Sequence, residues 1–292
     1  MEKIPLLVVV GPTASGKSKL AIEKALELGG EIISGDSMQI YKGMNIGTAK
    51  PFPDEMCGVP HHLIDVADIT EPFSAARFVE LASSAIADIS ARGKYPIIAG
   101  GTGLYIDTLI SGTELSATAD DPVLREQLFK EAEENGAEAL HRRLAAVDPI
   151  SADAIHPNNI KRVVRALEIY LKTGKTKSEL DRKSRENESI YAPKVIYICP
   201  KERETIYERI DRRVDVMFEQ GLEKEVRELV DMGLRETPTA SQAIGYKEFY
   251  PYFDGIIDID TVRENICLNT RHYAKRQLTW FNRKTVDEVV WI

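Results

Sequence analysis

The chain has 292 residues, long enough to bury a full α/β core together with an insertion or a second small domain. The composition, with 43% hydrophobic and 29% charged residues, is that of an ordinary globular protein, and the lack of a long apolar run excludes a membrane-spanning protein. The three cysteines are widely spaced, which excludes a local zinc knuckle. These features predict a cytoplasmic protein with no membrane partner. The net charge of −8 argues at first against a nucleic-acid partner.

Strands and helices alternate along the first ~110 residues. The apolar run 4–10 predicts a strand, and a glycine-rich loop leads from it into a helix at 17–28. A second short strand ends at Ser34, and a third, at 95–100, is closed by paired glycines. This alternation predicts an α/β fold of the P-loop NTPase-like kind, with a parallel sheet flanked by helices and with ligands at the carboxyl ends of the strands.

The glycine-rich loop fits the phosphate-binding pattern GxxxxGK[ST], placed after a strand and before a helix as that pattern requires. Backbone N–H groups would form the anion cradle, Lys17 would supply a point charge and Ser18 a hydroxyl ligand for Mg²⁺. The pattern does not specify which di- or triphosphate is bound. The residues expected to bind it are Gly11, Pro12, Thr13, Ala14, Ser15, Gly16, Lys17 and Ser18.

A phosphoryl-transfer enzyme with this loop usually has an acidic residue at the end of a neighbouring strand. The strand at 95–100 instead runs into Ala-Gly-Gly-Thr. The acid that follows a strand here is Asp36. Asp36 would orient a metal ion or act as a general base, or it would simply cap its own turn.

Residues 115–192 show helical patterns only, which predicts an inserted all-helical subdomain between two parts of an α/β core at 1–114 and 193–292. Residues 158–185 carry nine Lys/Arg against three Asp/Glu, and residues 271–284 carry five Lys/Arg and no acid. Two basic segments in an acidic chain indicate either a polyanion site or two solvated helix faces.

Several stretches together resemble one family, the tRNA dimethylallyltransferases. They occur in the family's order from residue 11 to 284, so the resemblance covers nearly the whole chain. Gly35 and Asn45 depart from the commoner family residues, and the zinc finger of eukaryotic members is absent, which indicates the bacterial type. The most specific stretches are "SGDSMQIYKGMNIGTAKP", "IIAGGTGLY", "HPNNIKRVVRALEIYLKTGK" and "TRHYAKRQLTWFNRK".

The resemblance implies that the loop holds the diphosphate of dimethylallyl diphosphate as a leaving group, with Mg²⁺ as cofactor. The five-carbon group would go to the exocyclic amine of the adenine 3′-adjacent to the anticodon in tRNA. Asp36 would then be the base, with Thr102 and Lys17 as further catalytic residues. Arg209 and Arg213, one helical turn apart, would close over the diphosphate, although such a pair is as often a surface feature.

The same resemblance assigns the basic segments to the anticodon stem-loop of tRNA. His272, Arg276 and Arg283 fall within about 40° of one another on an ideal helix predicted over 261–284. We expect a monomer. The residues expected to contact tRNA are Asp36, Ser37, Met38, Gln39, Thr102, Arg125, Lys161, Arg162, Val163, Val164, Arg165, His272, Arg276 and Arg283.

Three other interpretations stay open from the residues alone. A small-molecule kinase would use the same loop with ATP, but it would need a strand-end acid or lid arginines. A prenyltransferase acting on free AMP or ADP would not need a basic helical insertion. A nucleotide-switched RNA-binding protein would bind GTP or ATP and form no product.

Overall fold

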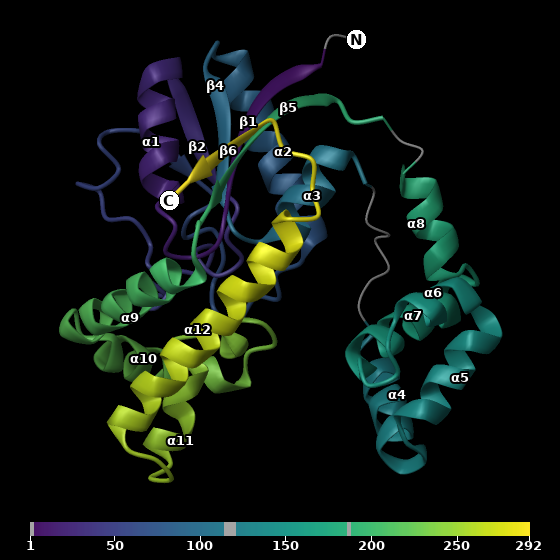
Figure 1. Ribbon diagram of the computed structural model, residues 1–292. Coiled ribbons are helices and arrows are strands. Elements are labelled where there is room, and N and C mark those ends of the chain that lie inside the picture. The colour runs from purple at the N-terminus through teal and green to yellow at the C-terminus, as the bar shows by residue number, and fades with distance from the viewer. Residues whose placement is uncertain (1–2, 114–120, 186–187) are drawn as a thin grey trace. The chain divides into compact units, whose positions relative to one another are not determined.

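The computed structural model describes residues 3–113, 121–185 and 188–292. The chain forms two compact units, one of residues 1–110 and 190–292 and one of residues 111–189 (Figure 1). The boundary predicted at residues 114–115 lies outside the described residues. No helix in the described part of the chain is long and apolar enough to cross a membrane.

The first unit is built on a six-stranded sheet in the order β3-β2-β4-β1-β5-β6. Every neighbouring pair is parallel, and β1 at the centre pairs with β4 on one side and β5 on the other. The parallel α/β sheet predicted from the sequence is therefore confirmed. The strands are β1 (Ile4–Val10), β2 (Gly30–Ser34), β3 (His61–His62), β4 (Tyr95–Gly100), β5 (Tyr191–Cys199) and β6 (Glu288–Trp291).

Alternate side chains of β1 enter two separate hydrophobic cores, as the two-residue period of a strand requires. Leu7 and Val9 pack in the smaller core with buried residues of α1 (Lys17–Leu28). Leu6 and Val8 pack on the opposite face, in the larger core that includes α2 (Ala75–Ala91) and α3 (Gly103–Ser111). Figure 1 shows α1 on one side of the sheet and α2 on the other. The sheet is thus covered on both faces.

The remaining helices of this unit gather beyond the carboxyl ends of the strands (Figure 1). Apolar residues of these helices pack in the larger core, so helices as well as loops cover the carboxyl ends of the strands. They are α9 (Arg203–Glu219), α10 (Leu222–Asp231), α11 (Tyr250–Phe253) and α12 (Ile259–Phe281), with 3₁₀ turns η1 (Leu234–Glu236), η2 (Ala240–Gln242) and η3 (Lys247–Phe249).

The second unit is all helical in its described part and has its own core. Asp121 and Asp148 cap two of its helices, each followed by a proline in the first turn, where a missing N–H costs nothing. Its helices are α4 (Pro122–Asn135), α5 (Ala137–Val147), α6 (Pro149–Ala154), α7 (Ile160–Thr173) and α8 (Lys177–Arg185).

One helix prediction is wrong at its carboxyl end. The helix predicted to run to Lys284 ends at Phe281, and Asn282 is its C-cap. Arg283 therefore lies in the turn after α12 and does not share a helical face with His272 and Arg276. The basic residues that follow Phe281 extended the helical pattern in the sequence, but no apolar residue after Phe281 continues the buried stripe.

Candidate active site

The loop between β1 and α1 forms an open cradle for an anion. Ala14 and Gly16 adopt left-handed conformations, with φ of 61° and 88°, and no side chain caps α1. The first turn of α1 also contains no acidic residue, so its N-terminal dipole is uncompensated. Among the described residues the buried Ser15 hydroxyl has no hydrogen-bond partner, and a bound phosphate would supply one.

Lys17 is the cation of this cradle. Its Nζ donates a hydrogen bond to the Pro12 carbonyl oxygen at 2.6 Å. The pKa of Lys17 is lowered to about 7, mainly by burial and also by the neighbouring Arg213 guanidinium, while Asp36 opposes the shift. The negative charge of a bound anion would offset both effects and favour the charged lysine.

Arg213 projects from α9 to the same loop. Its Nη1 donates to Thr13 Oγ1 at 3.4 Å, and burial lowers the pKa of this arginine. Arg209, one turn earlier, is exposed and does not line the central cavity; it borders a shallow hollow of about 280 Å³ with Arg212, Arg213 and Val216. The structure thus brings Arg213 to the phosphate loop and leaves Arg209 at the surface.

Asp36 follows the carboxyl end of β2, and one of its two carboxylate oxygens caps its own turn. Its Oδ1 accepts hydrogen bonds from the backbone N–H groups of Met38 at 2.8 Å and Gln39 at 3.3 Å. Within the described residues no hydrogen bond reaches Oδ2. The turn-capping role and a chemical role are therefore compatible, since the cap fixes the side chain and leaves one oxygen for a substrate.

Thr102 follows the paired glycines after β4. Its backbone N–H donates to the Gly35 carbonyl at 3.2 Å, and its Oγ1 accepts from the Ser37 N–H at 3.0 Å. Burial raises the pKa of Tyr273 to about 12, and the nearby Asp36 carboxylate raises it as well, while Thr102 acts in the opposite direction. These contacts hold the Thr102 hydroxyl beside the segment that carries Asp36.

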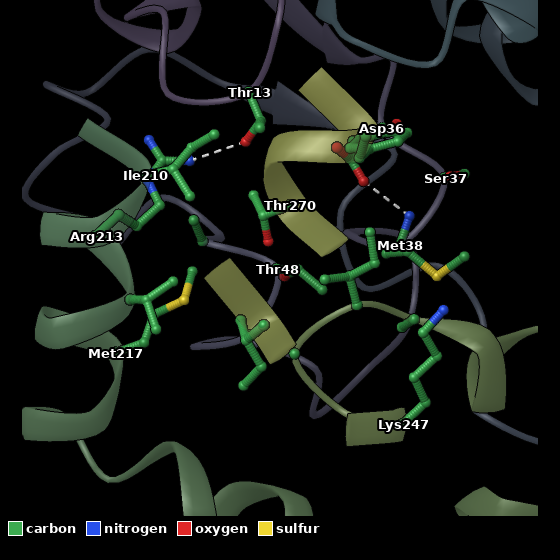
Figure 2. A pocket seen from close by; sticks show the side chains of 18 of the residues that line it. Thr13, Asp36, Ser37, Met38, Thr48, Ile210, Arg213, Met217, Lys247 and Thr270 are labelled. Atoms are coloured by element: carbon green, nitrogen blue, oxygen red, sulfur yellow. Dashed lines mark hydrogen bonds between the residues drawn. The ribbon is translucent and has the colours of Figure 1, made fainter. Parts of the chain in front are cut away.

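A cavity of about 260 Å³ is lined by Thr13 of the phosphate loop, Arg213 and Asp36, whereas Lys17 and Thr102 do not line it. Figure 2 shows Thr13 and Arg213 near one end, with Asp36, Ser37 and Met38 across from the side chains of α9. Aliphatic side chains of α9 and α12 line the space between, so the cavity combines an anion site, a carboxylate and an apolar wall. Its lining includes Thr13, Asp36, Ser37, Met38, Thr48, Ile210, Arg213, Val214, Met217, Ile244, Lys247, Ile266, Thr270, Tyr273 and Arg276.

Gln277 was not predicted from the sequence, yet it links two loops of the site. Its Oε1 accepts from the Thr13 backbone N–H at 2.8 Å, and its Nε2 donates to the Gly101 carbonyl at 3.0 Å. The side chain is buried among apolar residues of α12. The sequence does contain one indication of this role, because Gln277 lies one residue before Leu278, on the apolar face of the helix. Burying its side-chain amide there without hydrogen-bond partners would cost free energy.

Glu225 of α10 is a second residue that the sequence did not reveal. Its carboxylate accepts from the backbone N–H groups of Asn45, Ile46 and Gly47, and from the Tyr246 hydroxyl at 2.7 Å. Gly47 packs against the Tyr246 ring so closely that a Cβ would lie 2.4 Å from it. Glu225 therefore fixes the loop that forms one wall of the cavity.

Gln39, which the resemblance predicts to contact tRNA, uses its side-chain amide within the protein. Its Oε1 accepts from the Ser34 hydroxyl at 3.0 Å, and its Nε2 donates to the carbonyls of Thr48 and Ala49. Gln39 is absent from the cavity lining. Its amide is used to hold the loop around residue 48 against the end of β2.

Comparisons with known proteins agree with this arrangement. The family model described as IPP transferase matches residues 39–284. This chain belongs to the IPP transferase family. The tRNA dimethylallyltransferase of Geobacillus thermodenitrificans is 55% identical over 283 residues, which are 97% of this chain and 88% of that protein. The tRNA dimethylallyltransferase of Bacillus subtilis is 50% identical over 289 residues, 99% of this chain and 90% of that protein.

Solved structures of IPP transferase relatives share the fold. The full-length tRNA isopentenylpyrophosphate transferase of Bacillus halodurans has a TM-score of 0.72 at 46% identity, covering 100% of this chain and 90% of that one. A eukaryotic dimethylallyltransferase acting on tRNA has a TM-score of 0.82 at 31% identity, covering 99% of this chain and 73% of that one. The resemblance found from the sequence motifs is confirmed.

Among the residues predicted to contact tRNA in this IPP transferase, two are wrong. Val163 and Val164 are 0% and 1% exposed in the core of the helical unit, so their side chains cannot reach a ligand. They lie in the quoted basic stretch, but on the buried face of α7. Lys161 and Arg162 are exposed in the first turn of that helix.

Arg125 and Arg165 have a structural partner in the same unit. Both form ion pairs with Glu168, at 3.0 and 2.6 Å, and the Glu168 side chain is fully buried. Hydrogen bonds from the Asp121 N–H and from the two arginines keep the pKa of Glu168 low despite its burial. These arginines therefore compensate a buried charge as well as presenting part of their surface to solvent.

In the first unit, His272, Arg276 and Arg283 are all exposed. Arg276 lines the cavity, and its guanidinium lies 5.6 Å from the centre of the Tyr273 ring. Of these three residues, all within the described part of the chain, Arg276 lines the cavity and the other two do not.

The residues present fit a magnesium ion that is held mainly by a substrate. No group of three or more His, Cys, Asp and Glu side chains within the described residues could hold a metal by itself. Ser18 is exposed in the first turn of α1, next to the cradle. This donor set suits Mg²⁺, which keeps several waters and takes its other ligands from substrate phosphates.

Proposed function

We propose that this protein transfers a dimethylallyl group from dimethylallyl diphosphate to the exocyclic amine of the adenine 3′-adjacent to the anticodon in tRNA, releasing diphosphate. The observation that carries the proposal is the cavity itself. It has Thr13 of the phosphate loop and Arg213 near one end, the Asp36 carboxylate across from α9, and an apolar wall between them. The apolar wall suits the hydrocarbon part of a prenyl diphosphate.

The diphosphate would bind the loop from Gly11 to Ser18, where the N-terminus of α1 and the Ser15 hydroxyl favour an anion. Lys17 and Arg213 would neutralise the charge that develops as the bond between C1 of the prenyl group and the diphosphate oxygen breaks. The new bond forms between that carbon and the adenine amine nitrogen. Arg209 would attract the diphosphate from the surface.

Asp36 would accept the proton that the amine loses. An adenine amine is a weak nucleophile because its lone pair is shared with the ring, so a carboxylate in hydrogen-bond reach promotes attack. The Oδ1 cap from Met38 and Gln39 fixes the carboxylate for this task. Thr102, whose hydroxyl accepts from the Ser37 N–H, would orient the amine or the bridging oxygen.

Mg²⁺ would be held by Ser18 and by diphosphate oxygens, and it would supply charge neutralisation of the leaving group. That the metal ion is Mg²⁺ is itself part of the proposal. No carboxylate stands at the end of β4, which favours a leaving-group role for the phosphates over ATP hydrolysis.

The adenine must leave its stack to enter the cavity, so we propose base flipping. Ser37 and Met38 line the cavity and would contact the base. The tRNA backbone would be contacted by Arg276 at the cavity and by four exposed basic residues, His272, Arg283, Lys161 and Arg162. Because one chain lines the cavity, a monomer suffices, and a tRNA substrate implies a cytoplasmic location.

The experiment supplies purified protein with Mg²⁺, labelled dimethylallyl diphosphate and unmodified tRNA. Label in the tRNA fraction, with none on AMP in a parallel reaction, supports the proposal. Label on AMP would replace tRNA by a free nucleotide as the acceptor. Consumption of ATP without movement of label would favour a kinase and refute the proposal.

A further inference from the structure

One face of α9 forms the apolar wall of the cavity. Ile210, Val214 and Met217 are spaced at i, i+4 and i+7, so they lie on one stripe of the helix. All three line the cavity and are 0%, 2% and 8% exposed. Arg213 lies within the same stripe and reaches the phosphate loop. The anion site and the apolar wall are thus presented by a single rigid helix.

The order of these residues along α9 gives the wall a direction. Met217 is one helical turn beyond Arg213, which places their Cα atoms about 6 Å apart along the helix axis. Figure 2 shows Met217 on the same helix as Arg213, farther from Thr13. A chain attached to a diphosphate at Arg213 and running along α9 toward its carboxyl end therefore meets Val214 first and Met217 last, while Ile210 lies one turn before Arg213.

Like Ile210 and Val214, Met217 belongs to the large hydrophobic core, so the space behind its side chain is filled by packed protein. Unlike those two residues, Met217 is unbranched, and shortening it extends the cavity without changing the β-carbon or the helix. The cavity of about 260 Å³ must also admit a purine, so only part of its volume is left for the prenyl group.

We propose that Met217 closes the apolar end of the cavity and limits the transferred prenyl group to five carbons. The inference rests on the proposed function. For any donor the step is the same: the bond between C1 and the diphosphate oxygen breaks, C1 bonds to the amine nitrogen, and the amine proton leaves to Asp36. Only the length of the chain beyond C1 differs, and Met217 meets the part that a ten-carbon donor adds.

The test is a competition between equal concentrations of dimethylallyl and geranyl diphosphate in one reaction with unmodified tRNA. Mass spectrometry of the digested tRNA gives the ratio of ten-carbon to five-carbon product. This ratio does not depend on how much of a variant is folded. We expect Met217→Ala to raise the ratio at least tenfold over the wild type, in line with the effect of hydrophobic-pocket contacts on selectivity.

Met217→Val removes less of the side chain and is expected to shift the ratio in the same direction by a smaller factor. Met232→Ala is the matched control, because Met232 is 67% exposed and does not line this cavity. It should leave the ratio at the wild-type value.

An unchanged product ratio in both Met217 variants, with five-carbon product still formed, would refute the assignment of Met217 and leave the proposed function standing. A wild-type protein that forms neither product would overturn the proposed function and this inference with it.

Discussion

Replacing Gln277 by methionine removes two hydrogen bonds from the site while nearly preserving the shape of the side chain. The Thr13 N–H and the Gly101 carbonyl both lose their partner. A buried polar group left unsatisfied costs about 1–3 kcal/mol. Gly101 is buried, but Thr13 is partly exposed and recovers part of its hydration. We therefore expect the free energy of unfolding to fall by about 2–3 kcal/mol.

The same substitution releases the phosphate loop from the turn after β4. A misplacement of about 1 Å in a catalytic group lowers rates by up to ~10²-fold, so kcat/KM for dimethylallyl diphosphate should fall by one to two orders of magnitude. The assays are urea unfolding and label transfer to tRNA. Gln220→Met is the control: Gln220 is exposed, and its variant should stay within about 0.5 kcal/mol of the wild type.

Two results would refute this reasoning. If Gln277→Met unfolds at the same urea concentration as Gln220→Met, the two hydrogen bonds do not stabilise the unit. If its stability falls but kcat/KM is unchanged, Gln277 supports the fold without positioning the phosphate loop.

Two other predictions concern the cradle and the cavity wall. The pKa of Lys17 is about 7 without ligand, and a bound diphosphate favours the charged lysine. Above pH 7 the binding of diphosphate must therefore be accompanied by uptake of a proton. KM for dimethylallyl diphosphate should then rise by up to tenfold per pH unit between pH 7.5 and 9. A KM that is flat over this range would contradict the assigned state of Lys17. Gly47→Ala should reduce kcat/KM for tRNA prenylation at least tenfold, because its Cβ would collide with the buried Tyr246 ring and displace the cavity wall. Wild-type kinetics for this variant would show that the wall tolerates the shift.

Much of the fold was predictable because local patterns and tertiary packing agree. The apolar run of β1 is buried on both faces of a parallel sheet, and Gly16 at the end of the loop permits the left-handed conformation that starts α1. Asp36 was identified because an acid at the end of a buried strand lies where parallel sheets bind ligands. Its two alternative roles both proved compatible with the geometry, one for each carboxylate oxygen.

Other features depend on contacts between distant segments and leave little trace in the sequence. Gln277 and Glu225 act through backbone groups 264 and about 180 residues away, which no local spacing encodes. Val163 and Val164 were misassigned because a basic stretch was treated as one surface, although a helix turns two of its residues inward. The predicted helix was extended to include Arg283 because charge alone does not mark a helix end.

The most direct test of the central claim compares wild type with Asp36→Asn in the transfer of dimethylallyl groups to unmodified tRNA. Asparagine keeps an oxygen that accepts the Met38 and Gln39 N–H groups, so the turn and tRNA binding should persist while proton acceptance is lost. The account predicts prenylated adenine beside the anticodon with the wild type and turnover lower by roughly 10²-fold or more with the variant. Near wild-type turnover with Asp36→Asn would contradict it.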